Sequence, residues 1–238
     1  MSTSALPPPP WERAARRRPT RLPLTREAIV DAALAVLTRD GASAVTMRRV
    51  AEELGTGPAS LYAHVNDKEE LENLVFDRIA GEVPLPTPDA ARWREQVKEL
   101  LQNSMETFSR YPGVATFAFA RIPYGPNALA SSETLLELLR LGGVDDRVAA
   151  FATDLLHQYV LANAYEHSVV PAGGEGFEKA MEHYKQVNAY FKSLPAERFP
   201  NVVRLADALF DVGQDRFEFG LDILLTGLTL YASPPPSA

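Results

Sequence analysis

Apolar side chains recur along most of this chain at the three- and four-residue spacing of an amphipathic α-helix. The first clear stripe falls at i, i+3, i+4, i+7 and i+8 and consists of Ile29, Ala32, Ala33, Val36 and Leu37. Such a stripe covers one face of a helix. Thr25 is a suitable N-cap before it, and Gly41 is a suitable stop after it. The pattern therefore predicts a first helix between Thr25 and Gly41.

Three shorter helices are predicted next. The first spans about 46–55, the second spans about 58–64, and the third begins after Asn66 and ends near Gly81. Asn66, with Glu69 three residues later, resembles a capping box, which favours a helix start at this point.

A second group of helical patterns follows the prolines at 84, 86 and 88. The predicted helices lie at about 89–110, 112–121, 127–141, 145–169, 175–193, 200–211 and 215–231. No stretch shows the alternation of apolar and polar residues that is typical of a β-strand. The predicted fold class is all-α.

The average charge of the chain hides a contrast between its parts. The net charge is −7, yet residues 1–24 carry +4, while residues 25–81 carry −4 and residues 82–238 carry −7. Pro7–Pro10 prevents a helix in the first segment, so we expect residues 1–24 to be a disordered basic arm. The acidic remainder excludes a protein that coats nucleic acid through bulk positive charge.

The sequence contains no cysteine, which excludes disulfides, thiolate metal sites and cysteine nucleophiles. No secretory signal is evident, and no apolar run approaches the length of roughly 18 residues that a membrane span needs. We therefore expect a cytoplasmic protein without a membrane partner.

One short segment has the spacing of a helix-turn-helix. Ala51, Gly55 and Leu61 fall at relative positions 0, +4 and +10. In this motif the small residue lets two helices cross closely, the glycine supplies a positive φ in the turn, and the later apolar residue packs the second helix onto the first. The second helix is then free to enter the major groove of DNA.

Together with its flanks, this segment resembles the tetracycline-repressor (TetR) family of bacterial transcriptional regulators. The strongest matches are "LTREAIVDAAL", "TMRRVAEELG" and "PASLYAHVNDKEEL", and the later "DRFEFGLDILLTGL" resembles the last helix of that family's ligand and dimerisation domain. The resemblance implies a three-helix helix-turn-helix DNA-binding domain at 25–81. It also implies a larger helical effector-binding and dimerisation domain at 82–233, and leaves 234–238 as a tail.

The resemblance and the side-chain chemistry together select candidate DNA contacts, in which cations and hydroxyls meet phosphates or base edges and small apolar groups meet thymine methyls. These are Thr46, which also caps the second helix, Arg48, Arg49, Pro58, Ala59, Ser60, Tyr62, His64, Lys68 and, in the arm, Arg21. Several alternatives stay open. Either Arg48 or Arg49 is the main groove contact, Tyr62 is alternatively a core aromatic, His64 alternatively satisfies a helix end, and the arm is alternatively a solvated tail.

The second domain carries polar residues among apolar ones, as an effector pocket does. The candidate effector residues are Phe108, Phe117, Arg121, Asp154, His157, Gln158, Leu161 and Tyr165. Arg121 resembles by position an arginine near the drug-binding region of tetracycline repressors, and Phe117 stands where those repressors carry a metal-bound histidine. We therefore expect an apolar or aromatic effector bound without a metal. His157 is alternatively a hydrogen-bonded core histidine.

The last helix is apolar on more than one face, which predicts burial against a partner as well as against its own core. The candidate dimer contacts are Leu155, Tyr159, Phe217, Leu221, Leu224, Leu225 and Leu228. The alternative is a central helix that is buried within one subunit.

The sequence thus predicts a homodimeric repressor that a small molecule releases from a palindromic operator. A TetR-like activator and a helical adaptor for another protein are the alternatives. An enzyme is not expected, because the chain lacks Gly-x-Ser-x-Gly, HExxH and phosphate-cradling motifs, and its histidines show no i, i+4 pair. No cofactor or metal is expected.

Overall fold

The computed structural model describes residues 23–119, 121–169, 174–210 and 215–232. Arg21, most of the predicted arm and the predicted tail lie outside these residues. The regular elements of the described part are all helices, with no strand beyond one isolated bridge between Val144 and Ala232, which confirms the all-α prediction. None of its helices is both long enough and apolar enough to cross a membrane.

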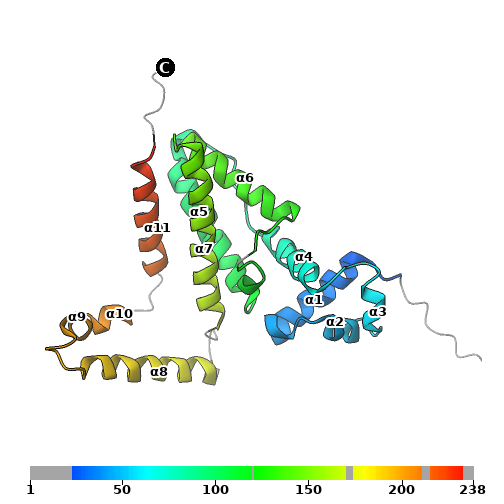
Figure 1. The fold of residues 1–238 in the computed structure, drawn as a ribbon, viewed down its shortest axis with the longest axis horizontal. Helices are drawn as coiled ribbons and strands as arrows, with labels where there is room; N and C mark the ends of the chain where they lie inside the picture. The colour runs from blue at the N-terminus through cyan, green and yellow to red at the C-terminus, as the bar shows by residue number, and fades with distance from the viewer. Residues whose placement is uncertain (1–22, 120, 170–173, 211–214, 233–238) are drawn as a thin grey trace, which may run out of the picture.

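The N-terminal region is a small bundle of short helices (Figure 1). It contains α1 (Arg26–Asp40), η1 (Ala42–Ala44), α2 (Met47–Glu53), α3 (Pro58–Leu61) and α4 (Lys68–Ala80). Thr25 and Thr46 cap α1 and α2 as predicted, each accepting a backbone N–H through its hydroxyl. The predicted N-cap of α4, Asn66, was wrong by one residue, because the N-cap is Asp67. The Asp67 carboxylate accepts the Glu70 N–H, and the Glu70 carboxylate accepts the Asn66 N–H.

The C-terminal region contains the longer helices. They are η2 (Ala90–Arg92), α5 (Trp93–Ser109), η3 (Val114–Phe117), α6 (Pro126–Leu141), α7 (Asp146–Val169), α8 (Gly174–Lys192), α9 (Pro200–Arg204), α10 (Ala206–Leu209) and α11 (Asp215–Thr229). The predicted helix at 112–121 is only the short turn η3, since Gly113 enters it with φ 77°. The predicted helix at 200–211 is divided between α9 and α10, whose junction at Leu205 departs from helical φ and ψ.

Three parts of the C-terminal region are distinct in Figure 1. Helices α5, α6 and α7 pack together as the main bundle, and α11 lies beside α7. Helices α8, α9 and α10 extend to one side, where α8 packs mainly on α9 and α10. Helix α4 contacts α1 on one side and α5, α6 and η3 on the other, so it joins the two regions.

Candidate nucleic-acid interface and effector cavity

The helix-turn-helix geometry follows from the three residues that the sequence singles out. Ala51 and Leu61 are fully buried, and α2 packs against α3. Gly55 has φ 62°, which side-chain-bearing residues rarely adopt, and the chain turns there so that the Thr56 N–H donates to the Ala51 carbonyl at 2.9 Å. These contacts fix α3 on α2 and leave the other side of α3 uncovered.

The uncovered side of α3 carries the predicted base- and phosphate-contacting groups. Pro58, Ala59 and Ser60 are exposed, and Tyr62 is 53% exposed, so the alternative of a core aromatic is wrong. The Ser60 hydroxyl accepts a hydrogen bond from the Thr56 hydroxyl at 3.2 Å. His64 is half-buried, and its carbonyl accepts from the Arg26 guanidinium at 3.2 Å, which ties the end of this segment to α1.

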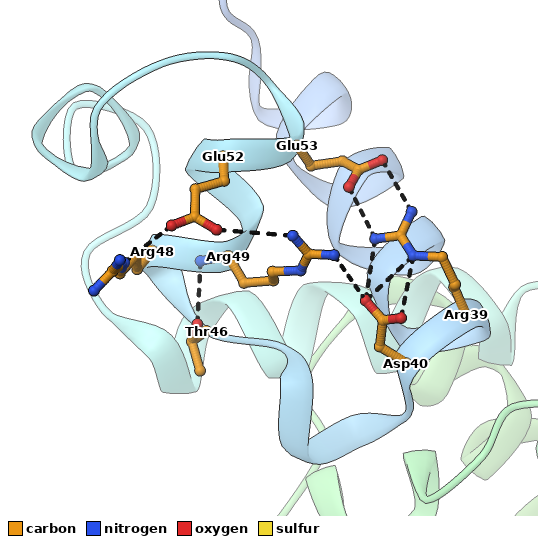
Figure 2. A network of polar contacts seen from close by, with 7 residues as sticks. All are labelled: Arg39, Asp40, Thr46, Arg48, Arg49, Glu52 and Glu53. Carbon is orange, nitrogen blue, oxygen red and sulfur yellow. Dashed lines mark hydrogen bonds and ion pairs between the residues drawn. The ribbon is translucent and has the colours of Figure 1, made fainter.

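The two adjacent arginines of α2 occupy different surroundings (Figure 2). The Arg49 guanidinium lies 3.2 Å from the Asp40 carboxylate at the end of α1 and 3.7 Å from that of Glu52. Arg48 contacts Glu52 alone among the described residues, at 3.0 Å, and 85% of its side chain is exposed. Arg48 is therefore the more available cation, and Arg49 ties α2 to α1.

A third arginine completes this charge network (Figure 2). Arg39 pairs with the carboxylates of Asp40 at 3.1 Å and Glu53 at 2.9 Å. Hydrogen bonds from the Arg39 guanidinium lower the pKa of both carboxyls, and Arg49 adds to the effect on Asp40. Both of these acids stay ionised. With Glu52 they give the network three acids for its three arginines, which limits the positive charge that the region presents to solvent.

Lys68 lies at the first position of α4, on the side of the domain where that helix meets the C-terminal region. Half of its side chain is exposed, and its ammonium lies 3.0 Å from the Glu72 carboxylate. Nearby, Arg26 of α1 forms an ion pair with Glu70 of α4. The candidate contacts within the described residues therefore come from the first turn of α2, from α3 and the residues just after it, and from the first residue of α4.

A cavity of about 830 Å³ lies between α4, α5, α6 and α7. Its volume falls within the range of about 300–1,000 Å³ that is usual for small-molecule sites. Of the predicted effector residues, six line it: Phe108, Arg121, Asp154, His157, Gln158 and Leu161. Sequence reasoning missed Phe76 and Ala80 of α4 and the small hydroxyl residues Ser104, Ser131, Ser132 and Thr153, because such residues are common on any helix.

Two predicted effector residues lie elsewhere. Phe117 lines a neighbouring cavity of about 200 Å³ together with Arg121, and Tyr165 lines neither cavity. Tyr165 is 40% exposed and packs edge to face on Phe119, with ring centroids 6.1 Å apart. Tyr165 therefore lies outside the lining of both cavities, next to the lining residue Phe119, and its effector role stays a prediction.

The polar groups of the larger cavity differ in charge. Burial lowers the pKa of His157, so its imidazole is neutral near pH 7, and the Asp154 carboxylate accepts a hydrogen bond from Gln158 at 2.8 Å. The Arg121 guanidinium lies 2.8 Å from Glu72 of α4, and this bond raises its pKa. No group of three or more histidine, aspartate and glutamate side chains that could hold a metal ion occurs in the described residues.

The predicted dimer contacts divide into two sets. Four residues of α11 face inward and are buried within the protomer, and these are Phe217, Leu221, Leu225 and Leu228. Phe217 stacks on Tyr159 of α7 with centroids 5.3 Å apart. Assigning these four side chains to a dimer contact was wrong, because they already pack α11 onto its own bundle. Leu155 remains 49% exposed, and Leu224 is partly buried.

The side chains that α7 and α11 leave exposed were missed in this prediction. They are Phe151 on α7, close to the predicted Leu155, and Phe219 and Ile223 on α11, each at least 56% exposed. An apolar residue two positions away from a buried one faces the other side of a helix, so the outer face could have been read from the same periodicity.

Two family models match the chain. Residues 85–231 match "Tetracyclin repressor-like, C-terminal domain", and residues 29–73 match "Bacterial regulatory proteins, tetR family". The curated "HTH-type transcriptional repressor DrrR1" of Streptomyces coeruleorubidus is 32% identical over 219 residues, which are 89% of this chain and 81% of the relative.

Solved structures of ActR, a TetR family protein of Streptomyces coelicolor, share the architecture. The complex with actinorhodin has a TM-score of 0.81 and 44% identity, covering 89% of this chain and 98% of ActR. The complex with (S)-DNPA has a TM-score of 0.80 and 42% identity, covering 89% of this chain and 100% of ActR. This chain therefore belongs to the TetR family of bacterial transcriptional regulators, with a helix-turn-helix region followed by a tetracycline-repressor-like C-terminal domain.

Proposed function

We propose that this regulator is a homodimeric repressor that leaves its operator when a small molecule enters the cavity between α4 and α7. The observation that carries the proposal is the position of α4. Its first residue, Lys68, is a candidate phosphate contact that follows the α3 segment in the chain, while Phe76 and Ala80 of the same helix line the cavity. One rigid element therefore belongs to both candidate sites.

The proposed DNA contacts are Tyr62, Ser60, Pro58, Ala59 and His64 of the α3 segment, with Arg48 and Lys68 on phosphates. The acidic network around Arg39 and Arg49 leaves only a few placed cations, so we expect weak binding to non-specific DNA and discrimination by geometry. The boundary near Gly81 divides the proposed DNA-binding domain from the effector domain. Such a protein acts in the cytoplasm, where operator DNA is found.

The proposed dimer uses the outer faces of α7 and α11. Phe151, Leu155, Phe219 and Ile223 form an apolar surface that a two-fold related copy can cover with the same residues. Two recognition segments then meet half-sites about 34–36 Å apart on a near-palindromic operator.

The proposed effector is an apolar or aromatic molecule. The support is the lining of the cavity, where Phe76 and Phe108 stack with centroids 5.0 Å apart and apolar residues outnumber polar ones. Two solved structures of the relative ActR contain actinorhodin and (S)-DNPA, which supports an effector that is a small molecule. The effector shifts the protein toward a non-binding conformation only by its differential affinity for the two states.

A mobility-shift assay tests the function. The wild-type chain is mixed with the intergenic DNA beside its own gene, and Tyr62→Ala is compared with Tyr190→Ala, which removes a tyrosine of similar exposure from α8. We expect Tyr62→Ala to lose specific binding while remaining dimeric, and Tyr190→Ala to bind as the wild type does. Equal operator affinity of all three proteins contradicts the assigned recognition segment.

The same assay separates the alternatives. Absence of a shift with wild-type protein favours an adaptor that binds another protein. A shift that no small molecule reverses, together with lower transcription in a deletion strain, favours an activator.

A further inference from the structure

Glu72 is a buried acid shared by two cations that belong to different candidate sites. Its side chain is 9% exposed. One carboxylate oxygen, Oε1, lies 3.0 Å from the Lys68 ammonium, and the other, Oε2, accepts from the Arg121 guanidinium at 2.8 Å. Lys68 is the proposed phosphate contact, whereas Arg121 lines the effector cavity. A single carboxylate therefore connects the two sites electrostatically.

Arg121 is also the group that an acidic ligand would meet. Among the described residues that line the larger cavity, it is the sole side chain with a permanent positive charge. His157, on the opposite wall in α7, is neutral near pH 7, and Asp154 is an acid. The Arg121 side chain is 37% exposed and lines the smaller cavity as well, so the carboxylate of a ligand can reach its guanidinium and replace Glu72 as its partner.

We infer that Arg121 binds the acidic group of the effector, and that neutralising Arg121 leaves Glu72 to hold Lys68 away from operator DNA. The inference rests on the proposed function and names the chemical class of its effector, an aromatic carboxylic acid. In the free protein, the Glu72 carboxylate pairs with both cations, so Lys68, Glu72 and Arg121 together carry a net charge of +1, and the exposed Glu69 carboxylate lies 3.8 Å from Arg121. Once the effector's carboxylate pairs with Arg121, Glu72 and Lys68 remain as a neutral pair.

The physical reason is the cost of an uncompensated buried charge. A buried carboxylate that loses one of its two cations holds the other more strongly, because little solvent is present to replace the lost partner. The Lys68 ammonium then pairs with the Glu72 carboxylate and not with a phosphate of the DNA. The lost phosphate contact lowers operator affinity and also its dependence on salt.

This electrostatic coupling from Arg121 through Glu72 to Lys68, called the relay below, does not need a displacement of α4 as a whole. The C-terminal half of the helix is held separately, since the Asp77 carboxylate accepts backbone N–H bonds from Asn127 and Ala128 at 2.9 Å. Charge at the N-terminal end of α4 can therefore change while this joint with α6 stays intact.

Variants test the relay without any effector. Arg121→Met removes the cation and so imitates the effector-bound state, and Glu72→Gln removes the shared charge. The matched control is Glu69→Gln, which removes an acid from the same turn whose side chain is 68% exposed and lies 3.8 Å from Arg121. Operator affinity is measured by fluorescence anisotropy at several salt concentrations, with circular dichroism and mass measurements confirming a folded dimer.

We expect Arg121→Met to lower operator affinity about tenfold and to reduce the salt slope by up to about 0.9 per subunit, which is the loss of one phosphate contact. Arg121→Lys, which keeps the charge, should retain most of the affinity. Glu72→Gln should bind the operator more tightly than Glu69→Gln does. The inference is overturned if Arg121→Met keeps the operator affinity and salt slope of the wild type. It is also overturned if Glu72→Gln and Glu69→Gln bind the operator equally, and this second comparison remains valid even if Arg121→Met does not fold.

The ligand class is tested with 2-naphthoate and its neutral methyl ester as probes. We expect the acid to bind the wild type at least tenfold more tightly than Arg121→Met and to weaken operator binding, while the ester binds both proteins equally. An acid that binds the wild type no better than the ester, or not at all at about 1 mM, overturns the assignment. A wild-type protein that binds no operator refutes the proposed function instead, so the two failures are distinguishable.

Discussion

The joint between α4 and α6 should contribute more to stability than an ordinary surface acid. Asp77 of α4 is 8% exposed, and its Oδ1 accepts the backbone N–H groups of Asn127 and Ala128, both at 2.9 Å. These are among the first N–H groups of α6, whose own N-cap, Gly125, provides no side chain. The approach is close, since a Cβ on Gly125 would lie 2.1 Å from the Asp77 Cγ. Asp77 therefore caps α6 from a different helix.

The expected loss for Asp77→Ala follows from these contacts. Removing a helix cap costs about 1 kcal/mol, and losing a partly buried negative charge at a helix N-terminus costs about 1 kcal/mol more. An N–H group that is left buried without a partner adds about 1 kcal/mol or more. We therefore expect a loss of about 3 kcal/mol in the free energy of unfolding, which for a chain of this size lowers Tm by roughly 6–12 °C.

Thermal and urea unfolding, followed by circular dichroism at one fixed protein concentration, measure this loss. The control is Asp31→Ala on α1, whose carboxylate is 65% exposed and lies 4.0 Å from Arg78. We expect that variant to stay within about 0.5 kcal/mol of the wild type. If Asp77→Ala is no less stable than Asp31→Ala, the capping argument is refuted.

Three further changes test other parts of the structure. Arg48→Ala should weaken operator binding and lower its salt slope with little effect on Tm, because its guanidinium is exposed; an unchanged slope in anisotropy titrations contradicts a phosphate contact. Gly220→Ala should destabilise the protein by about 1–3 kcal/mol, because the new Cβ would lie 2.0 Å from the Tyr159 hydroxyl. Its control, Gly227→Ala, would place a Cβ with no atom within 4 Å and should be neutral or slightly stabilising in the same thermal unfolding experiments. The free energy of unfolding should fall as the pH drops below about 6.5, because burial lowers the pKa of His157 and the unfolded chain then takes up a proton that the folded protein does not. In unfolding titrations, His157→Gln should show a smaller fall than the wild type. An identical pH profile of the two proteins argues against a buried neutral imidazole.

Local features of the chain were predictable because their causes are local. Thr25 and Thr46 cap helices through hydroxyls that reach N–H groups three residues away, and Gly41 ends α1 with φ 81°. The cap of α4 was missed by one residue, because Asn66 and Asp67 are both good caps and only the folded turn decides which one meets Glu70. The helix-turn-helix was predictable for the same reason, since its spacing lies within a dozen residues.

The roles of acidic residues required the tertiary structure. An aspartate or glutamate on a helix is usually solvated, so no pattern in the chain singles out Glu72 or Asp77. Both are buried because α4 lies between two regions, and the partners that compensate them come from residues 49 and 50 positions away. Likewise, the choice between Arg48 and Arg49 depended on Asp40, which reaches Arg49 from the end of α1.

The sequence by itself determined the helical class, most helix ends, the helix-turn-helix and the family resemblance, because periodicity, capping and motif spacing act over a few residues. Only the tertiary structure decided which apolar faces of α11 are already covered, which polar residues meet in one cavity, and which charges are shared between α4 and its neighbours. Periodicity gives the apolar face of a helix but not the neighbour that covers it, and the energy of a charge depends on groups that folding brings within a few ångströms.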